Sequence, residues 1–186
     1  MNKFAFLDRD GVINQDNSYV YRIEDFKFLR GIFSLCKTLK TFNYKIAIIT
    51  NQSGIGRGLY TEEQYNTLKE WMLDKFYKRN IEINYVMHCP YHPESIIKKY
   101  RKLSNLRKPD VGMIEQIDKI EKINRQDSII IGDQMSDIMC GYNANLKYGI
   151  LINKKFQGFK TKLKNFNYFE VNSLTEATKV IHELNV

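Results

Sequence analysis

The 186-residue sequence lacks several features that would place a chain in a special structural class. Its three cysteines, Cys36, Cys89 and Cys140, are odd in number and widely spaced, so they form no disulfide framework and no CxxC zinc pattern. No stretch approaches the ~18 consecutive apolar residues of a membrane span. No N-terminal segment has the apolar length and the small-residue cleavage site of a signal peptide. We therefore expect a cytoplasmic protein in a reducing compartment, without a membrane partner.

What the sequence does contain is enough apolar material for one core. Apolar residues make up 43% of the chain and charged residues 27%, which excludes wholesale disorder. The length lies within the ~100–200 residues usual for one domain, and no repeat or linker divides it. We predict a single domain over residues 1–186, with a loop at 88–108.

The net charge of +8 comes from two segments. Residues 96–108 contain six basic residues and residues 154–164 contain five, and neither segment contains an acid. One interpretation is a pair of solvated, lysine-rich loops. The other is attraction of an anionic substrate, either a small phosphate ester or a nucleic acid.

Apolar runs and helical spacings alternate along the chain. Short buried runs predict strands at 4–7, 46–49, 81–87, 128–131 and 148–152. Apolar residues at helical spacing, or a capping box, predict helices near 32–39, from Thr61, over 113–120, from about Ser136 and from Ser173. This alternation predicts an α/β fold, a doubly wound Rossmann-like parallel sheet with helices on both faces. In such a sheet, ligands bind beyond the carboxyl ends of the strands.

Two carboxylates follow the first predicted strand. Side chains of an extended segment alternate with period two, so Asp8 and Asp10 can face the same way. Carboxylates that close repel each other unless a cation lies between them or one holds a proton. Asp133 follows the fourth strand and could join them around one Mg²⁺, a hard cation that prefers oxygen ligands. Ser136 and Asp137 are interpreted as residues that cap the next helix.

A glycine-rich segment follows the second strand, and a lysine ends the long loop. Thr50 is followed by Asn51, Gln52, Ser53 and three alternating glycines, a pattern that lets backbone N–H groups approach an anion. The Walker ending and the GxGxxG fingerprint are both absent. A plain flexible turn is the alternative interpretation of this loop, and an ordinary surface lysine is the alternative for Lys108.

The order of these signals is more specific than any one of them. D-x-D-G, then Thr, then Lys, then G-D-x-x-x-D, each at a strand end, resembles the haloacid dehalogenase-like (HAD-like) superfamily of phosphohydrolases. The segments 6–14, 50–58 and 89–94, with Arg107-Lys108-Pro109, resemble the D-glycero-D-manno-heptose 1,7-bisphosphate 7-phosphatase family. The match runs from about residue 4 to residue 151.

The resemblance implies a Mg²⁺-dependent phosphatase that works through an aspartyl-phosphate and supplies precursors of ADP- or GDP-heptose. It implies that Asp8 is the nucleophile and Asp10 the general acid and base, that Thr50 and Lys108 hold the phosphoryl group, and that the metal ligands are Asp8, Asp10 through its main-chain carbonyl, and Asp133. The residues expected to contact the rest of the substrate are Asp16, Asn17, Ser18, Tyr19, Asn51, Gln52, Ser53 and Arg107. No room is left for a separate cap domain.

This chain departs from the family pattern at two places. Gln134 stands where the family often has a lysine beside the metal aspartate. The family's structural zinc is held by three cysteines and a histidine, and the corresponding positions here are Cys89, Tyr91, Ser104 and Leu106. Only Cys89 can ligate as a thiolate, so structural zinc is not expected. We expect instead that Tyr91, Leu103 and Leu106 pack the loop and that Cys89 is a buried free thiol.

Three other functions remain as alternatives. Histidinol-phosphate phosphatases share this chain plan, and a polynucleotide 3′-phosphatase has a similar T-N-Q-x-G-I-G-R-G loop. A non-catalytic binding module would be expected to have lost one of the acids, yet all of them are in place. The expected partner is a small phosphorylated sugar, with nucleic acid disfavoured, and the expected state is a monomer.

Overall fold

The computed structural model describes residues 1–153, 161–163 and 166–185, and its centre is one seven-stranded sheet. The strands lie in the order β3-β2-β1-β4-β5-β7-β6. Neighbours are parallel from β3 to β7, and β6 pairs antiparallel with β7 at the edge. The strand bounds are β1 Phe4–Leu7, β2 Lys45–Asn51, β3 Tyr85–Cys89, β4 Ile129–Gly132, β5 Tyr148–Ile152, β6 Thr161–Leu163 and β7 Phe166–Val171.

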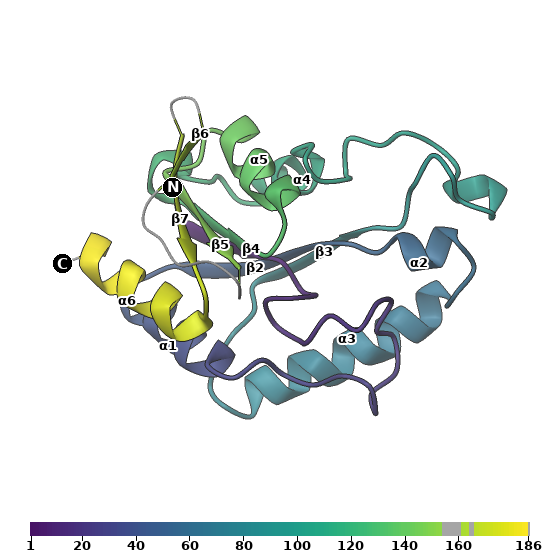
Figure 1. Cartoon of the computed structure of the whole chain (residues 1–186), viewed down its shortest axis with the longest axis horizontal. Coiled ribbons are helices and arrows are strands. Elements are labelled where there is room, and N and C mark those ends of the chain that lie inside the picture. The colour runs from purple at the N-terminus through teal and green to yellow at the C-terminus, as the bar shows by residue number, and fades with distance from the viewer. Residues whose placement is uncertain (154–160, 164–165, 186) are drawn as a thin grey trace.

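Helices cover both faces of this sheet, as the doubly wound prediction requires. Figure 1 shows α4 and α5 above the sheet and α1, α3 and α6 below it. The bounds are α1 Ile32–Thr41, α2 Ser53–Gly56, α3 Glu62–Tyr77, α4 Gly112–Ile120, α5 Met135–Asn143 and α6 Leu174–Asn185. The capping box that predicts α3 is present, since Thr61 accepts from the Gln64 backbone and Gln64 accepts from the Thr61 backbone. No helix of the described residues is long and apolar enough to cross a membrane.

Burial on both faces explains why the central strands are apolar without alternation. In β1, Ala5 and Leu7 belong to the core cluster on one face of the sheet, and Phe4 and Phe6 belong to the cluster on the other. All four side chains are fully buried. The sheet is therefore a rigid platform, and the residues that follow β1, β2 and β4 are held at one edge of it.

The structure differs from the sequence prediction at four elements. The third strand begins at Tyr85 rather than at residue 81, because Ile81 closes the end of α3 with a backbone hydrogen bond to Phe76. The glycine-rich segment contains a short helix, α2. Strands β6 and β7 were not predicted, since Phe166–Val171 includes Asn167 and Glu170 and forms a strand through long-range pairing with β5.

Between Asp10 and Thr50 the chain forms loops, α1 and most of β2, and between Thr50 and Lys108 it forms loops, α2, α3 and β3. Neither interval contains a separate cap domain, as expected. The segment between β3 and α4 extends beyond α2 at one end of the molecule (Figure 1). Of the two basic segments, 154–164 lies mostly outside the described residues.

Candidate active site

The first site residues leave the sheet directly from β1. Asp8 is 9% exposed, and its Oδ1 accepts hydrogen bonds from the Arg9 backbone at 2.7 Å and from Lys108. Gly11 has a φ of 81°, a backbone conformation that favours glycine. A Cβ at Gly11 would also lie 2.1 Å from the Asp133 carboxylate, so the glycine lets Asp133 approach the end of β1.

Lys108 is a buried cation with a partner for each of its three N–H donors. Its Nζ lies 2.9 Å from Asp8 Oδ1 and 2.6 Å from Asp137 Oδ1, and it donates to the Ile49 carbonyl at 2.8 Å. Burial by itself lowers the pKa of Lys108, but Asp8 and Asp137 outweigh burial and hold the pKa above its ordinary value. The lysine is therefore a fixed positive charge beside Asp8, and it is not the surface lysine of the alternative interpretation.

Asn51, at the end of β2, fixes the backbone that carries this lysine. Its Oδ1 accepts from the Lys108 backbone N–H at 3.1 Å, and its Nδ2 donates to the Lys108 carbonyl at 3.2 Å. This pair joins the long loop to the sheet next to the site. The amide of Asn51 is engaged within the protein, and its contact with substrate stays a prediction.

The carboxylate of Asp10 is held from three directions. Its Oδ1 accepts from Arg9 at 2.8 and 3.2 Å and from Asn14 at 2.9 Å. Its Oδ2 accepts from Gln52 Nε2 at 2.9 Å, and the same nitrogen donates to Thr50 Oγ1 at 2.8 Å. Arg9 is 2% exposed, so its charge is paired with Asp10 inside the protein. These contacts place Asp10 beside Thr50.

Three carboxylates at the edge of the sheet form a group that could hold a metal. One ligand atom from each of Asp8, Asp133 and Asp137 lies within 4.8 Å of the others, and this is the one such group among the described residues. Burial raises the pKa of Asp8 to about 7 against the opposing charge of Lys108, and Asp137 and Asp10 add to the rise. Burial also raises the pKa of Asp133 to about 6, with Asp137 adding to it. Crowded oxygen donors of this kind fit a hard divalent cation, which would offset their repulsion.

Asp137 does more than the capping role predicted for it. Its Oδ2 accepts from the Gln134 backbone N–H at 3.0 Å, which satisfies a donor at the start of α5. Its Oδ1 pairs with Lys108, so Asp137 also belongs to the site. The interpretation of Asp137 as a cap alone was wrong, because a carboxylate has two oxygens that can bond in different directions. Gln134 donates to Asp133 Oδ2 at 3.1 Å.

The residues predicted to contact the rest of the substrate lie in segments after β1, at the start of α2 and before α4, and their contact with substrate stays a prediction. Asp16, Asn17, Ser18 and Tyr19 form an exposed turn in which Ser18 and Tyr19 have positive φ. Ser53 begins α2. Arg107 is half-buried and lines a hollow of about 400 Å³, with His92, Lys102, Ser104, Lys108 and Asp110. Within the described part of the chain, Nη1 of Arg107 is buried without a hydrogen-bond partner.

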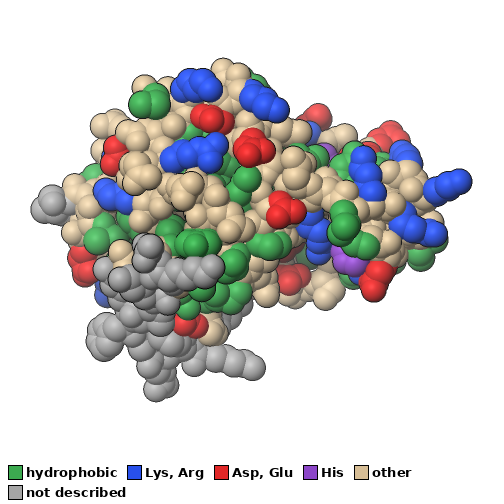
Figure 2. Space-filling view, turned by 90° about the horizontal axis from the view of Figure 1, so that it is seen from above, with side chains coloured by type: hydrophobic (Ala, Val, Ile, Leu, Met, Phe, Trp, Pro, Cys, Tyr) green, Lys and Arg blue, Asp and Glu red, His purple; other side chains and the backbone are tan. Residues whose placement is uncertain are grey.

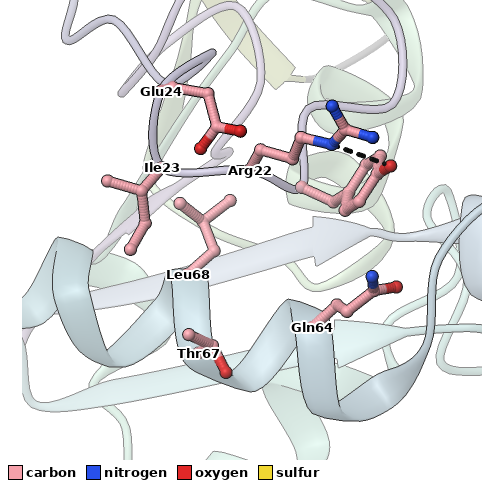
Figure 3. A pocket seen from close by; sticks show the side chains of 7 residues that line it. Arg22, Ile23, Glu24, Gln64, Thr67 and Leu68 are labelled. Atoms are coloured by element: carbon pink, nitrogen blue, oxygen red, sulfur yellow. Dashed lines mark hydrogen bonds between the residues drawn. The ribbon is translucent and has the colours of Figure 1, made fainter.

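A second pocket, of about 300 Å³, lies between residues 21–24 and α3. Figure 3 shows Arg22, Ile23 and Glu24 on one side of it and Gln64, Thr67 and Leu68 of α3 on the other. Arg22 donates to the Tyr21 hydroxyl at 3.0 Å (Figure 3). None of the predicted site residues lines this pocket, so the group at the strand ends remains the candidate active site.

The loop that carries the family's zinc positions is packed by side chains. Cys89 is a buried free thiol, as predicted, and Tyr91 and Leu106 pack against the core cluster that contains it. Lys102 lies over the ring of Tyr91 at 4.2 Å. The prediction that Leu103 packs the loop was wrong, because Leu103 is 85% exposed. His88 pairs with Glu62 at 2.9 Å. The donor set here does not fit a tetrahedral zinc site.

Besides Asp137, sequence reasoning missed three residues around the site. Arg9 and Asn14 hold Asp10, and the Tyr60 hydroxyl donates to Gln52 Oε1 at 2.6 Å. The position of Arg9 between two acidic residues at the end of a strand could have indicated that it pairs with one of them. Nothing in the local sequence indicates Tyr60, because its partner is set by tertiary packing.

Known proteins resemble the chain over most of its length. The sequence model of the family described as polynucleotide kinase 3 phosphatase matches residues 3–170. A Campylobacter jejuni protein, D-glycero-alpha-D-manno-heptose-1,7-bisphosphate 7-phosphatase, is 41% identical over 174 residues, which are 90% of this chain and 96% of the relative. The Haemophilus influenzae beta-anomer phosphatase is 38% identical over 152 residues, 82% of each chain. The crystal structure of D,D-heptose 1.7-bisphosphate phosphatase from B. bronchiseptica, complexed with magnesium and phosphate, has a TM-score of 0.81 at 22% identity and covers 98% of this chain and 99% of its own.

Proposed function

The chain belongs to the polynucleotide kinase 3 phosphatase family of HAD-like phosphatases, and from this premise we propose that it removes the 7-phosphate of D-glycero-D-manno-heptose 1,7-bisphosphate. The observation that carries the chemistry is the position of Asp8, a buried carboxylate fixed beside the buried cation Lys108. The substrate comes from the relatives, whose similarity covers most of both chains.

In the first step, an oxygen of Asp8 attacks the 7-phosphorus, and the bond between phosphorus and the sugar oxygen breaks. The electron pair leaves with the sugar oxygen, which takes a proton from Asp10. The products are the heptose 1-phosphate and an aspartyl-phosphate on Asp8. Lys108 and the Thr50 hydroxyl lie beside Asp8 and Asp10, where they can hold the phosphoryl oxygens and offset their charge.

In the second step, water attacks the aspartyl-phosphate. Asp10 accepts one proton from the water, and the bond between phosphorus and the Asp8 oxygen breaks, which frees inorganic phosphate and restores the Asp8 carboxylate. Asp10 ends with the proton it began with, so the cycle is balanced.

Asp8, Asp133 and the main-chain carbonyl of Asp10 would hold Mg²⁺, and Asp137 lies within reach of the same position. The cation, when bound, would offset charge on the phosphoryl group and on the crowded carboxylates. The magnesium and phosphate of the B. bronchiseptica structure support this assignment.

A second candidate, a polynucleotide 3′-phosphatase, has one specific observation in its favour. The exposed side chains of Lys98, Lys99, Arg101 and Lys102 form a basic end of the molecule next to the site. Figure 2 shows Lys and Arg side chains gathered at that end. The heptose substrate remains the main proposal, because the relatives that match nearly full length carry that name.

The test is a panel of initial rates with Mg²⁺ and with EDTA. Both anomers of the heptose bisphosphate, histidinol phosphate and a 3′-phosphorylated oligonucleotide are compared by kcat/KM. We expect one heptose anomer to be preferred by at least about tenfold over the other substrates, and EDTA to abolish the rate. A higher kcat/KM for the oligonucleotide or for histidinol phosphate would replace the heptose assignment.

A further inference from the structure

We propose that Tyr60 is a positioning residue for the reaction, acting through Gln52 on the carboxylate of Asp10. The proposal rests on the proposed function in one respect, since it takes Asp10 as the group that gives and accepts the proton. Among the described residues, the Tyr60 hydroxyl bonds to Gln52 alone, and no bond joins it to Asp8.

Gln52 can hold Asp10 only in one orientation of its amide. The side chain is 2% exposed, and its Nε2 donates one hydrogen to Asp10 Oδ2 and the other to Thr50 Oγ1. A flipped amide would place Oε1 against the Asp10 carboxylate, where two acceptors repel. The Tyr60 hydroxyl donates to Oε1 at 2.6 Å and so favours the productive orientation. Burial raises the pKa of Tyr60, which keeps the hydroxyl protonated and able to donate.

Tyr60 is itself fixed by close packing. Its ring stacks on Tyr21 at 5.1 Å, and the residue is 4% exposed. A Cβ at Gly54 would lie 2.2 Å from the Tyr60 ring, so the glycine of this loop makes room for the tyrosine. Gly54 lies inside α2, and this contact gives a packing reason for the glycine. The approach of this loop to an anion stays a prediction.

These contacts determine which oxygen of Asp10 reacts. Oδ1 receives three hydrogen bonds from Arg9 and Asn14, whereas Oδ2 receives one from Gln52. A carboxylate oxygen has two lone pairs, so Oδ2 keeps one for the proton that goes to the sugar oxygen and later comes from water. Tyr60 and Gln52 therefore set the direction of that lone pair.

The test compares Tyr60→Phe with the control Tyr21→Phe, using 4-nitrophenyl phosphate in rapid-mixing experiments. Nitrophenolate leaves without needing a proton, so formation of the aspartyl-phosphate does not depend on Asp10, whereas its hydrolysis does. We expect Tyr60→Phe to keep the rate of the nitrophenolate burst within about twofold and to lower the steady-state rate by ~3–10-fold, the loss typical of one buried hydrogen bond. KM should fall in proportion to kcat, because only the second step is slowed, so kcat/KM and the circular dichroism spectrum should be unchanged.

Tyr21→Phe removes a hydroxyl from the stacked neighbour while leaving Gln52 bonded, and both phases should match the wild type. Gln52→Met, which removes the donor itself, should lower the steady-state rate further than Tyr60→Phe does. Equal losses in burst and steady state, or no loss in either variant, would overturn the proposal. Failure of the heptose assignment would show separately, as a wild-type enzyme that hydrolyses 4-nitrophenyl phosphate but neither heptose anomer.

Discussion

Lys108 shows how much of this site depends on the environment of single residues. A buried lysine without partners would lose its proton, but here Asp8, Asp137 and the Ile49 carbonyl take all three donors. The charge is thus fixed where phosphoryl oxygens would lie. Asn51 also fixes the position of Lys108 by hydrogen-bonding to both its backbone N–H and its carbonyl.

At the same scale, Asp8→Asn should abolish turnover while leaving the fold intact. The amide has the shape of the carboxylate but is not a nucleophile, so we expect kcat to fall by roughly 10⁴-fold or more, as for other nucleophile replacements. Steady-state assays with saturating Mg²⁺ measure this, with Asp25→Asn at an exposed position as the control. More than a trace of activity in Asp8→Asn would exclude Asp8 as the nucleophile.

The crowded carboxylates also predict how pH and Mg²⁺ affect stability. Asp8 has a pKa of about 7 in the folded chain against an ordinary value of 3.8, so the folded state without metal holds a proton that the unfolded state releases. The stabilisation of the folded state by this proton is complete below about pH 4 and is lost as the pH rises through 7. The stabilisation that comes from a proton on Asp133 is lost in the same way as the pH rises through about 6.

Because Mg²⁺ bound to these carboxylates would take the place of the protons, we expect Mg²⁺ to raise Tm more at pH 8 than at pH 5. Thermal unfolding with EDTA and with Mg²⁺ at both pH values measures the difference. Asp8→Asn serves as the control and should show a smaller dependence on pH. An equal Mg²⁺ effect at both pH values would contradict the assignment of the metal to these acids.

At the scale of elements, the loop between β3 and α4 contains the positions at which the family resemblance implies zinc ligands. Tyr91 and Leu106 pack on the core, Lys102 lies over Tyr91, and Arg101 donates to the carbonyls of Ser95 and Ile96. These contacts close the loop with side chains and backbone, without thiolate ligands.

We therefore expect protein purified without chelator to contain far less than one equivalent of zinc. Treatment with EDTA, followed by removal of the chelator and addition of Mg²⁺, should leave Tm unchanged. Tyr91→Ala, which removes the packing, should lower Tm, whereas Leu103→Ala at an exposed position should not. Near-stoichiometric zinc by elemental analysis, lost on Cys89→Ser, would show that the loop is a metal site after all.

At the scale of the whole molecule, the basic residues of segment 96–108 differ in their exposure to solvent. The described basic loop places Lys98, Lys99, Arg101 and Lys102 in solvent, whereas Arg107 is half-buried and Lys108 is buried. The four exposed cations contribute to a long-range field, and Lys102 also lines the hollow next to Arg107 and Lys108.

If the exposed cations serve only solubility and steering, duplex DNA should bind weakly and modest salt should remove it. Replacing Lys98 and Lys99 by Gln should then reduce the slope of log K against log salt by up to ~2, with hydrolysis of the sugar phosphate unchanged. Fluorescence anisotropy at several salt concentrations measures this. Tight, salt-resistant binding to 3′-phosphorylated ends would favour the polynucleotide function.

Local sequence determined most of the architecture and the position of several candidate site residues. Strands that are buried on both faces are continuous apolar runs in the sequence, so β1, β2, β4 and β5 were predictable. Most helices were predictable from the helical spacing of their apolar residues and from their caps. Asp8, Thr50 and Asp133 were predictable because polar side chains after parallel strands share one edge of the sheet.

Only the tertiary structure decided how those groups are held. The pairing of Lys108 with both Asp8 and Asp137 and the bond from Gln52 to Asp10 join residues that are far apart in the chain. The bond from Tyr60 to Gln52 spans only eight residues, but its geometry also depends on packing. Hydrogen bonds and ion pairs depend on distance and direction in space, and the order of residues specifies neither until the core has packed. Strand β7 was also decided by the tertiary structure, because this segment forms a strand by pairing with β5.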